Sequence, residues 1–533
     1  METTTFTQSN YINDYNSLQL SLPLNLGIKI DSNSEVVSFL KAIEGVNLGK
    51  YLKRDEGRGR KGHDRVMILK VILFAYSLGE RELRKMEELC RNDIRFLYLS
   101  DESTPSHMTF ERLMKNYLIK DIDDIFFEVS LSIGSKMNID THIQYIDGTK
   151  IEANANKNTF VYKKRILNAR EKLFPKITEL IIRMNMELGY AFPYHYFYCA
   201  QEIGYMLQYL METMVTTDTE IVYGKGKRKT AFQKYYDEFM EYYTKLDGYE
   251  YWLDIIGSER NSCSKTDHDA TMCATKMDYY CNTGLSRPCY NAQIAVSDGI
   301  IVNADLYQRA GDTKTFIPFM ERNYEYTGRY PEYPVTDAGY GSYDNYMFCL
   351  THDIKLFMKY PMYAKKNTAD FQKKIYNTIN WKKNEFGFRI CPNGEVFNCY
   401  LHDHYENDGT YLKIKQLYTT EEDKCEACPH KQECCKSERR VISRDVVLEE
   451  FYATVDENLS TEYGKELKKQ RSIQAEGAFG VIKQDMKFIR FTRRGIENAK
   501  MEFLLVCLGY NLKKFHLHRL KEMKKETEIS IIN

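Results

Sequence analysis

Three acidic residues lie where apolar stretches of the sequence end or a helical pattern begins. Asp147 follows "IQYI", Asp337 follows "YPVT", and Glu476 lies in "RSIQAEGAFGVIK". Magnesium prefers hard oxygen ligands, and two divalent ions about 4 Å apart can activate a nucleophile and stabilise the leaving oxygen in phosphoryl transfer. Three carboxylates converging from two strand ends and one helix could hold both ions. The set therefore indicates phosphoryl-transfer chemistry.

Each of these acids also has a purely structural explanation. Aspartate commonly forms a turn after a strand, and glutamate near a helix start interacts favourably with the helix dipole. For any one acid taken alone, the structural explanation is preferred. Only the three together argue for a site.

A second group of chemistry-bearing residues is a cluster of cysteines. Six of the 14 cysteines lie between positions 391 and 435, four of them in "CEACPHKQECC". A C-x₂-C pair followed by further cysteines can supply thiolate ligands for one structural Zn²⁺. Cysteine is too soft a ligand for Mg²⁺-dependent phosphoryl transfer, and the alternative is a set of reduced thiols. The candidate zinc ligands are Cys391, Cys425, Cys428, Cys434 and Cys435.

Two basic segments are candidates for contact with nucleic acid. Residues 464–500 contain ten Lys/Arg against four Asp/Glu, and "KFIRFTRRG" interleaves aromatic residues with arginines, as segments that contact DNA often do. The other segment, "GRGRKGHD", is a glycine-punctuated loop. A solvated basic surface is the alternative for both. The predicted phosphate contacts are Arg490, Arg493, Arg494, Arg58, Arg60 and Lys61.

The elements that must position these residues follow an interrupted α/β pattern. Residues 1–138 read as an all-helical, DNA-binding-type domain, in which "TPSHMTFERLMKN" could be a recognition helix or could pack in the core. A strand, a hairpin turning at Asp298-Gly299, and alternating helices and strands follow over 139–515. We expect a helical insert at about 160–260, a cysteine-bearing insert at about 360–455, and a basic C-terminal tail over 516–533.

Composition favours a soluble, cytoplasmic protein of several domain-sized units. The 533 residues are 43% hydrophobic and 28% charged, which suffices for sizeable cores. No run of 18 apolar residues predicts a membrane helix, and the first 20 residues lack the features of a secretory signal. The net charge is zero, so contacts with nucleic acid must depend on local charge.

The stretches around the three acids resemble the catalytic blocks of bacterial insertion-sequence transposases of the DDE type. These stretches are "YIDGTKIEANANK", "VTDAGYGSYDNY" and "EGAFGVIKQDMKFIRFTRRGIENAKMEFLLVCLGYNLKK". Residues 57–99 are similar to the helical N-terminal domain of that family, and "YNAQIAV" with "DTKTFIPFME" to its central hairpin and helix. The resemblance implies an RNase H-like α/β core, a mixed sheet flanked by helices.

The resemblance also implies roles for single residues. Asp147, Asp337 and Glu476 correspond to the catalytic acids, which hold two Mg²⁺ ions, with Mn²⁺ as an alternative. Lys483 corresponds to a lysine that contacts DNA phosphate.

One part of the family signature is not met. The signature has an arginine four residues before the glutamate and a tyrosine three residues before that. Ser472 and Lys469 occupy those positions here, and Arg471 lies five residues before the glutamate. Arg471 can take the arginine's place if the helix begins after it.

The function implied by the resemblance is DNA transposition. Water attacks a phosphodiester at the element end, and the freed 3′-hydroxyl attacks target DNA. The implied partners are terminal inverted repeats, target DNA and a second copy of the chain in a synaptic complex, in association with the bacterial nucleoid. The rivals are an RNase H-like nuclease or domesticated transposase that cleaves or binds DNA without transposition, and a non-enzymatic, zinc-stabilised DNA-binding protein. Convergence of the three carboxylates separates enzymes from the last rival.

Overall fold

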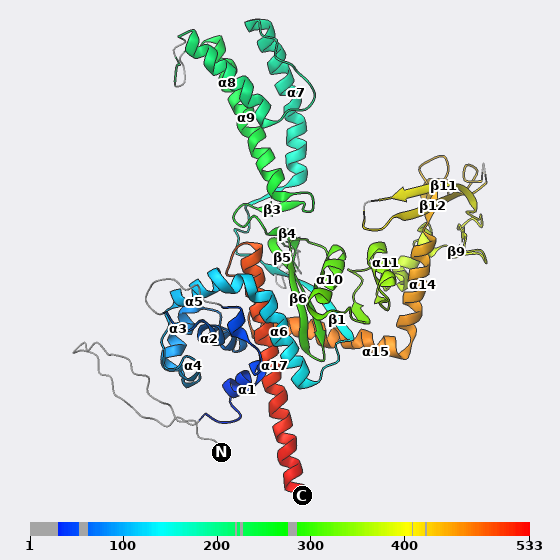
Figure 1. Cartoon of the computed structure of the whole chain (residues 1–533). Helices are drawn as coiled ribbons and strands as arrows, with labels where there is room; N and C mark the ends of the chain where they lie inside the picture. The colour runs from blue at the N-terminus through cyan, green and yellow to red at the C-terminus, as the bar shows by residue number, and fades with distance from the viewer. Residues whose placement is uncertain are drawn as a thin grey trace.

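A mixed six-stranded sheet forms the centre of the protein in the computed structural model (Figure 1). The structure describes residues 30–52, 62–218, 221–223, 228–275, 285–407, 409–421 and 424–532. The strands are β1 (Ile143–Glu152), β4 (Thr271–Ala274), β5 (Ser286–Ser297), β6 (Ile300–Tyr307), β7 (Tyr333–Thr336) and β8 (Phe357–Met358).

The order of the strands and their directions are those of the RNase H-like fold. Along β6–β5–β1–β7–β8, the first two pairings are antiparallel and the last two are parallel. Strand β4 pairs with the first residues of β5. Helices α10 (Phe316–Thr327) and α11 (Tyr343–Thr351) follow β6 and β7. The predicted fold class, a mixed sheet flanked by helices, is confirmed.

Strand β1 runs straight through the Asp-Gly pair that the sequence suggested as its end. The expectation that Asp147 ends the strand is wrong, because Asp147 pairs with Ile294 and Gly148 with Gln293 in one continuous ladder. A Cβ atom on Gly148 would lie 2.2 Å from Gln293 Nε2. The glycine therefore permits a close approach rather than a turn. The turn expected at Asp298-Gly299 does join β5 to β6, with both residues at positive φ.

Helices precede the sheet, as expected. They are α1 (Glu35–Ile43), α2 (Arg65–Ser77), α3 (Leu83–Asn92), α4 (Ile94–Leu99), α5 (His107–Leu113) and α6 (Ile119–Met137). A π-helical turn, η2 (Met114–Leu118), joins α5 to α6. Phe110 and Leu113 of α5 are buried, so these two residues of the suggested recognition helix pack in the core.

The last helix, α17 (Ile496–Ile532), ties the N-terminal helices to the sheet. It packs against α2, α6 and β6, and Gly509 lets it approach α2 closely, since a Cβ there would lie 2.4 Å from the Tyr76 carbonyl oxygen. The N-terminal helices and the sheet consequently share one hydrophobic core. The boundary predicted between residues 515 and 516 falls inside this helix. Among the described residues, no helix is long and apolar enough to cross a membrane.

Two structures interrupt the core. Helices α7 (Lys163–Leu188), α8 (Ala200–Thr216) and α9 (Ala231–Ile256) form a helical arm that stands away from the sheet (Figure 1). At its base, β2 (Phe160–Tyr162) pairs with β3 (Ser262–Ser264). The arm has its own hydrophobic core.

The second interruption is a small lobe between β8 and α14 (Val446–Ser460). Its elements are α12 (Ala369–Gln372), α13 (Lys431–Cys434), β9 (Lys382–Lys383), β10 (Arg389–Ile390), β11 (Cys399–Glu406), β12 (Lys413–Thr419) and β13 (Ile442–Arg444). Trp381, Phe397, Tyr418 and Ile442 form its core. Helix α14 leads back from the lobe toward the sheet (Figure 1).

Candidate active site

The parallel pairing of β1 with β7 brings Asp147 and Asp337 to one level of the sheet. Tyr145 is the register partner of Val335, and the two aspartates lie two residues further along, Asp337 directly after the end of β7. Side chains two residues apart in a strand point to the same face, and neighbouring strands are about 4.8 Å apart. The two carboxylates therefore face the same side of the sheet from adjacent strands.

Glu476 reaches the same place from a continuous helical stretch. The stretch consists of α15 (Glu462–Arg471), the π-helical turn η6 (Ser472–Glu476), α16 (Gly477–Gly480) and the π-helical turn η7 (Val481–Asp485). Arg471 Nη2 lies 2.7 Å from Glu476 Oε1, and Arg471 Nη1 lies 3.3 Å from Asp147 Oδ1. A single guanidinium thus joins the acid of the strand to the acid of the helix.

The π-helical turn accounts for the five-residue spacing between Arg471 and Glu476. In a π-helix the backbone hydrogen bond spans five residues instead of four, so residues five apart lie one above the other. The helix does not begin after Arg471, as the sequence prediction required for Arg471 to take the arginine's place. The helical stretch begins at Glu462 and includes Arg471. The extra residue is absorbed in η6, and Arg471 faces Glu476.

The environment of Asp147 disfavours its charge. Burial raises the pKa of Asp147 to about 6, with further increases from the charges of Asp337 and Glu476, although Arg471 acts in the opposite direction. Only 16% of its side chain is exposed. The Arg471 guanidinium therefore offsets the burial of Asp147 and the repulsion from the other two acids only in part.

The donor set fits Mg²⁺, since it consists of hard carboxylate oxygens. Asp147 and Glu476 already share one cation, the Arg471 guanidinium. With the side chains in these positions, however, no group of three or more His, Cys, Asp or Glu among the described residues is arranged to hold a metal ion. A divalent ion held by Asp147 and Glu476 would compete with the Arg471 guanidinium for these two carboxylates.

A polar network that the sequence did not indicate lies on the opposite face of β1. Asp312 Oδ1 accepts hydrogen bonds from Lys150 Nζ at 2.8 Å, Asn291 Nδ2 at 2.7 Å and Gln293 Nε2 at 3.0 Å. The Tyr340 hydroxyl donates to Gln293 Oε1. Asp312 is the first residue of the "DTKTFIPFME" block. In the sequence it looks like an ordinary acidic residue before a helix, and nothing there indicates the network. The network supports the strand segment that carries Asp147.

Lys483, the predicted phosphate contact of the helical stretch, lies against β1. Its Nζ donates to Thr149 Oγ1 at 2.6 Å and to the Lys150 carbonyl oxygen at 3.3 Å. Thr149 lies two residues after Asp147 on the same face of the strand. Lys483 is therefore a neighbour of the acids.

The predicted DNA-contact arginines hold the loop between η7 and α17 in place. Arg490 donates to the carbonyl oxygens of Ala153 and Ala155 at 3.2 and 3.0 Å. Arg493 pairs with Glu111 of α5, at 3.1 and 2.5 Å, and Arg494 Nε donates to the Asn154 carbonyl oxygen at 2.9 Å. All three use part of their hydrogen-bonding capacity within the chain, and their contact with DNA stays a prediction. The remaining candidates, Arg58, Arg60 and Lys61, lie outside the described residues.

The candidate zinc ligands are thiols that take part in local packing and hydrogen bonds. Cys391, Cys425 and Cys434 pack against the core of the small lobe. Arg440 Nη1 donates to Cys434 Sγ at 3.0 Å, and Cys435 Sγ lies 3.0 Å from Ser437 Oγ. The described cysteines, Cys428 included, are free. Since none of the described Cys, His, Asp or Glu side chains forms a group that could hold a metal ion, the zinc prediction gains no support.

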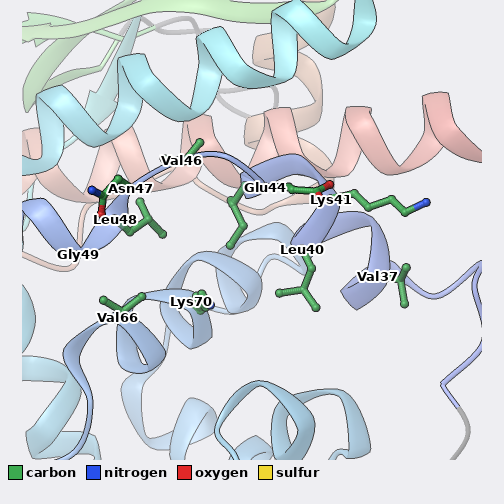
Figure 2. A pocket seen from close by; sticks show the side chains of 11 residues that line it. Val37, Leu40, Lys41, Glu44, Val46, Asn47, Leu48, Gly49, Val66 and Lys70 are labelled. Atoms are coloured by element: carbon green, nitrogen blue, oxygen red, sulfur yellow. The ribbon is translucent and has the colours of Figure 1, made fainter. Parts of the chain in front are cut away.

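A separate hollow of about 560 Å³ lies between α1 and α2 (Figure 2). Apolar side chains such as Leu40 and Val66 line it together with Lys41 and Lys70. None of its lining residues belongs to the acidic site or to the predicted DNA contacts. This hollow is thus separate from the acids.

Comparison with protein families matches two separate parts of the chain to transposase families, and Asp147 and Asp337 lie outside both matched ranges. Residues 390–516, which include Glu476 and Lys483, match the family described as "Transposase DDE domain". Residues 25–116, which include α1 to α5, match "Transposase domain (DUF772)". No curated protein and no solved structure gives a significant match. The two family matches together support an insertion-sequence transposase of the DDE type.

Proposed function

We propose that this transposase cuts DNA at the ends of its element and joins the freed ends to target DNA. One observation carries the proposal. Asp147 and Asp337 lie at one level on neighbouring parallel strands, and Arg471 links Asp147 to Glu476. A non-enzymatic DNA-binding protein has no need of three converging carboxylates, one of them with a raised pKa.

The three acids would hold two Mg²⁺ ions, which supply activation of the attacking oxygen and stabilisation of the leaving oxygen. In the cutting step the water oxygen bonds to phosphorus, water loses a proton, and the P–O3′ bond breaks. The electron pair leaves on O3′, which takes up a proton. In the joining step that 3′-hydroxyl loses its proton, bonds to a target phosphorus and displaces a target O3′.

Other residues would bind the DNA strand around this chemistry. Arg471, when displaced from the acids, is placed to bind a phosphate, and Lys483 lies close enough to follow the same strand. Arg58, Arg60, Lys61, Arg490, Arg493 and Arg494 are proposed backbone contacts. We assign residues 1–138 to DNA binding and 139–515 to the catalytic core with its two inserts. Two copies would act together, because two element ends must be cut.

A plasmid that carries the gene with its own flanking DNA tests the proposal. Purified protein with Mg²⁺ should cut this plasmid at two positions outside the reading frame and join the ends to a second plasmid. Asp337→Asn should bind the flanking DNA in a gel shift yet cut nothing. Cutting by this variant would refute the catalytic assignment. Cutting without joining would identify a nuclease that has lost transposition.

A further inference from the structure

Lys359 stands at the same level of the sheet as the two catalytic aspartates. Strand β8 pairs in parallel with β7, and Val335 and Thr336 are the register partners of Phe357 and Met358. Lys359 follows Met358 as Asp337 follows Thr336, so one row across three neighbouring strands contains Asp147, Asp337 and Lys359. Each step along this row is about 4.8 Å, and the three side chains face the same way.

The Lys359 ammonium faces the acids without pairing with them. Within the described part of the chain its Nζ makes no hydrogen bond and no ion pair, whereas Lys483 and Arg471 are both engaged. Burial is the main cause that lowers the pKa of Lys359, and Arg471 and Lys468 lower it further, while Asp337 and Glu476 raise it. The ammonium therefore lies within the field of both acids.

A half-buried cation without a partner is costly unless an anion completes it. The acids cannot be the anion that pairs with Lys359 once they hold metal ions. The anion expected in this place is a DNA phosphate, because the acids of the same row define where the reacting phosphate must lie. Lys359 flanks that position on the side of Asp337 away from Asp147.

We propose that Lys359 is a further catalytic residue, whose ammonium binds a non-bridging oxygen of the scissile phosphate. This inference rests on the proposed function of the acids. Charge on the transferred phosphoryl group spreads over its non-bridging oxygens in the transition state. A cation fixed in a half-buried position stabilises that charge more than one in water. A contact with a flanking phosphate, by contrast, would contribute to DNA binding alone.

The test compares Lys359→Met, Lys359→Gln and Lys359→Arg with the matched control Lys355→Met. Lys355 precedes β8 and is exposed. The probe is a duplex with the end sequence at which wild type cuts its own flanking DNA. Single-turnover cutting is measured with saturating protein and Mg²⁺, binding by gel shift, and folding by melting temperature. Both neutral variants should cut about 100- to 1,000-fold more slowly, with unchanged binding and melting. Lys359→Arg should recover part of the rate, and Lys355→Met should match wild type.

Three outcomes would overturn the inference. Wild-type rates in both neutral variants would make Lys359 a surface residue. Weaker binding with a normal rate at saturation would move the contact to a flanking phosphate. If wild type and Asp337→Asn behave alike on the same duplex, the proposed function itself fails, and the role of Lys359 fails with it. If Lys359→Met has a lowered melting temperature, the cutting rate of Lys359→Gln, whose side chain keeps a polar end, decides whether Lys359 is catalytic.

Discussion

Arg471 and Glu476 form an ion pair of 2.7 Å across a spacing of five residues. A π-helical turn brings the two side chains to the same face, and the second amino group of Arg471 reaches Asp147. The guanidinium therefore occupies the place where the acids of the strand and of the helix meet. In the absence of metal, the positive charge of the site comes from the chain itself.

Replacement of Arg471 should expose the repulsion among the acids. We expect Arg471→Ala to lose roughly 1–3 kcal/mol of unfolding free energy in EDTA at pH 7.5, because a mostly buried partner of two carboxylates is removed. Millimolar Mg²⁺ should then raise its melting temperature more than that of wild type, since no guanidinium competes for the acids. Arg471→Lys, which keeps the charge, is the control. If Mg²⁺ raises the melting temperatures of wild type and Arg471→Ala equally, the guanidinium does not compete with the ion for the acids.

Much of the fold could be predicted from local patterns. Gly79 ends α2 and Gly495 precedes α17, both with positive φ, and the Asp298-Gly299 turn forms as its sequence requires. The three acids could be assembled only through the resemblance of their blocks to a family. Asp147 and Asp337 are 190 residues apart in the sequence, and no short-range pattern specifies the pairing of β1 with β7 that brings them together.

Other features could not be predicted from the sequence. Asp147 and Gly148 have the composition of a turn, yet pairing with β5 on one side overrides that local preference. The π-helical turns have no sequence signature, so the displaced position of Arg471 seemed to disagree with the family signature. Lys359 was missed because no sequence pattern indicates that β8 pairs with β7, the pairing that brings this lysine level with Asp337.

Deletion of a single residue tests the π-helical turn. Removal of Ile473, which is 56% exposed, should convert η6 to a regular α-helical turn and keep Arg471 opposite Glu476, because four residues then span the turn. We expect unfolding free energy within about 1 kcal/mol of wild type. Removal of exposed Lys469 from the regular helix α15 is the control. It rotates every earlier residue of α15 by one position and should lower the melting temperature clearly. Equal losses in both deletions would show that η6 does not absorb the extra residue.

Substitution of Gly148 tests the close approach between β1 and β5. A Cβ there would lie 2.2 Å from Gln293 Nε2 and 2.9 Å from Asp312 Oδ1, so Gly148→Ala should cost about 1–3 kcal/mol through overpacking. Because Gln293 and Asp312 belong to the network behind Asp147, cutting should slow as well. Gly248→Ala in α9, where a Cβ meets nothing within 4 Å, should instead stabilise by about 0.5–1 kcal/mol. Denaturant unfolding measures the stability of both variants. An unfolding free energy of Gly148→Ala equal to that of wild type would show that β1 and β5 have room for a methyl group at this position.

The pKa of Asp147 predicts how the stability of the metal-free protein changes with pH. The folded protein holds the proton on Asp147 up to about pH 6, whereas the ordinary value is 3.8. As pH rises through this window, the unfolded chain releases the proton first. Wild type should therefore lose stability, by roughly 1–3 kcal/mol in total. Asp147→Asn carries no charge and escapes this loss, so its advantage over wild type in EDTA should grow between pH 4.5 and 7.

Denaturant unfolding of both proteins at pH 4.5, 5.5 and 7 measures that advantage. Asp370→Asn serves as the control for the loss of one carboxylate away from the site, because 94% of the Asp370 side chain is exposed. A difference between Asp147→Asn and wild type that stays constant over this pH range would mean that the fold does not disfavour the Asp147 charge. If the stability advantage of Asp147→Asn grows with pH in EDTA but disappears at pH 7 with Mg²⁺, the ion compensates the unfavourable charge of Asp147. The ion then stabilises wild type and not a variant that lacks the carboxylate.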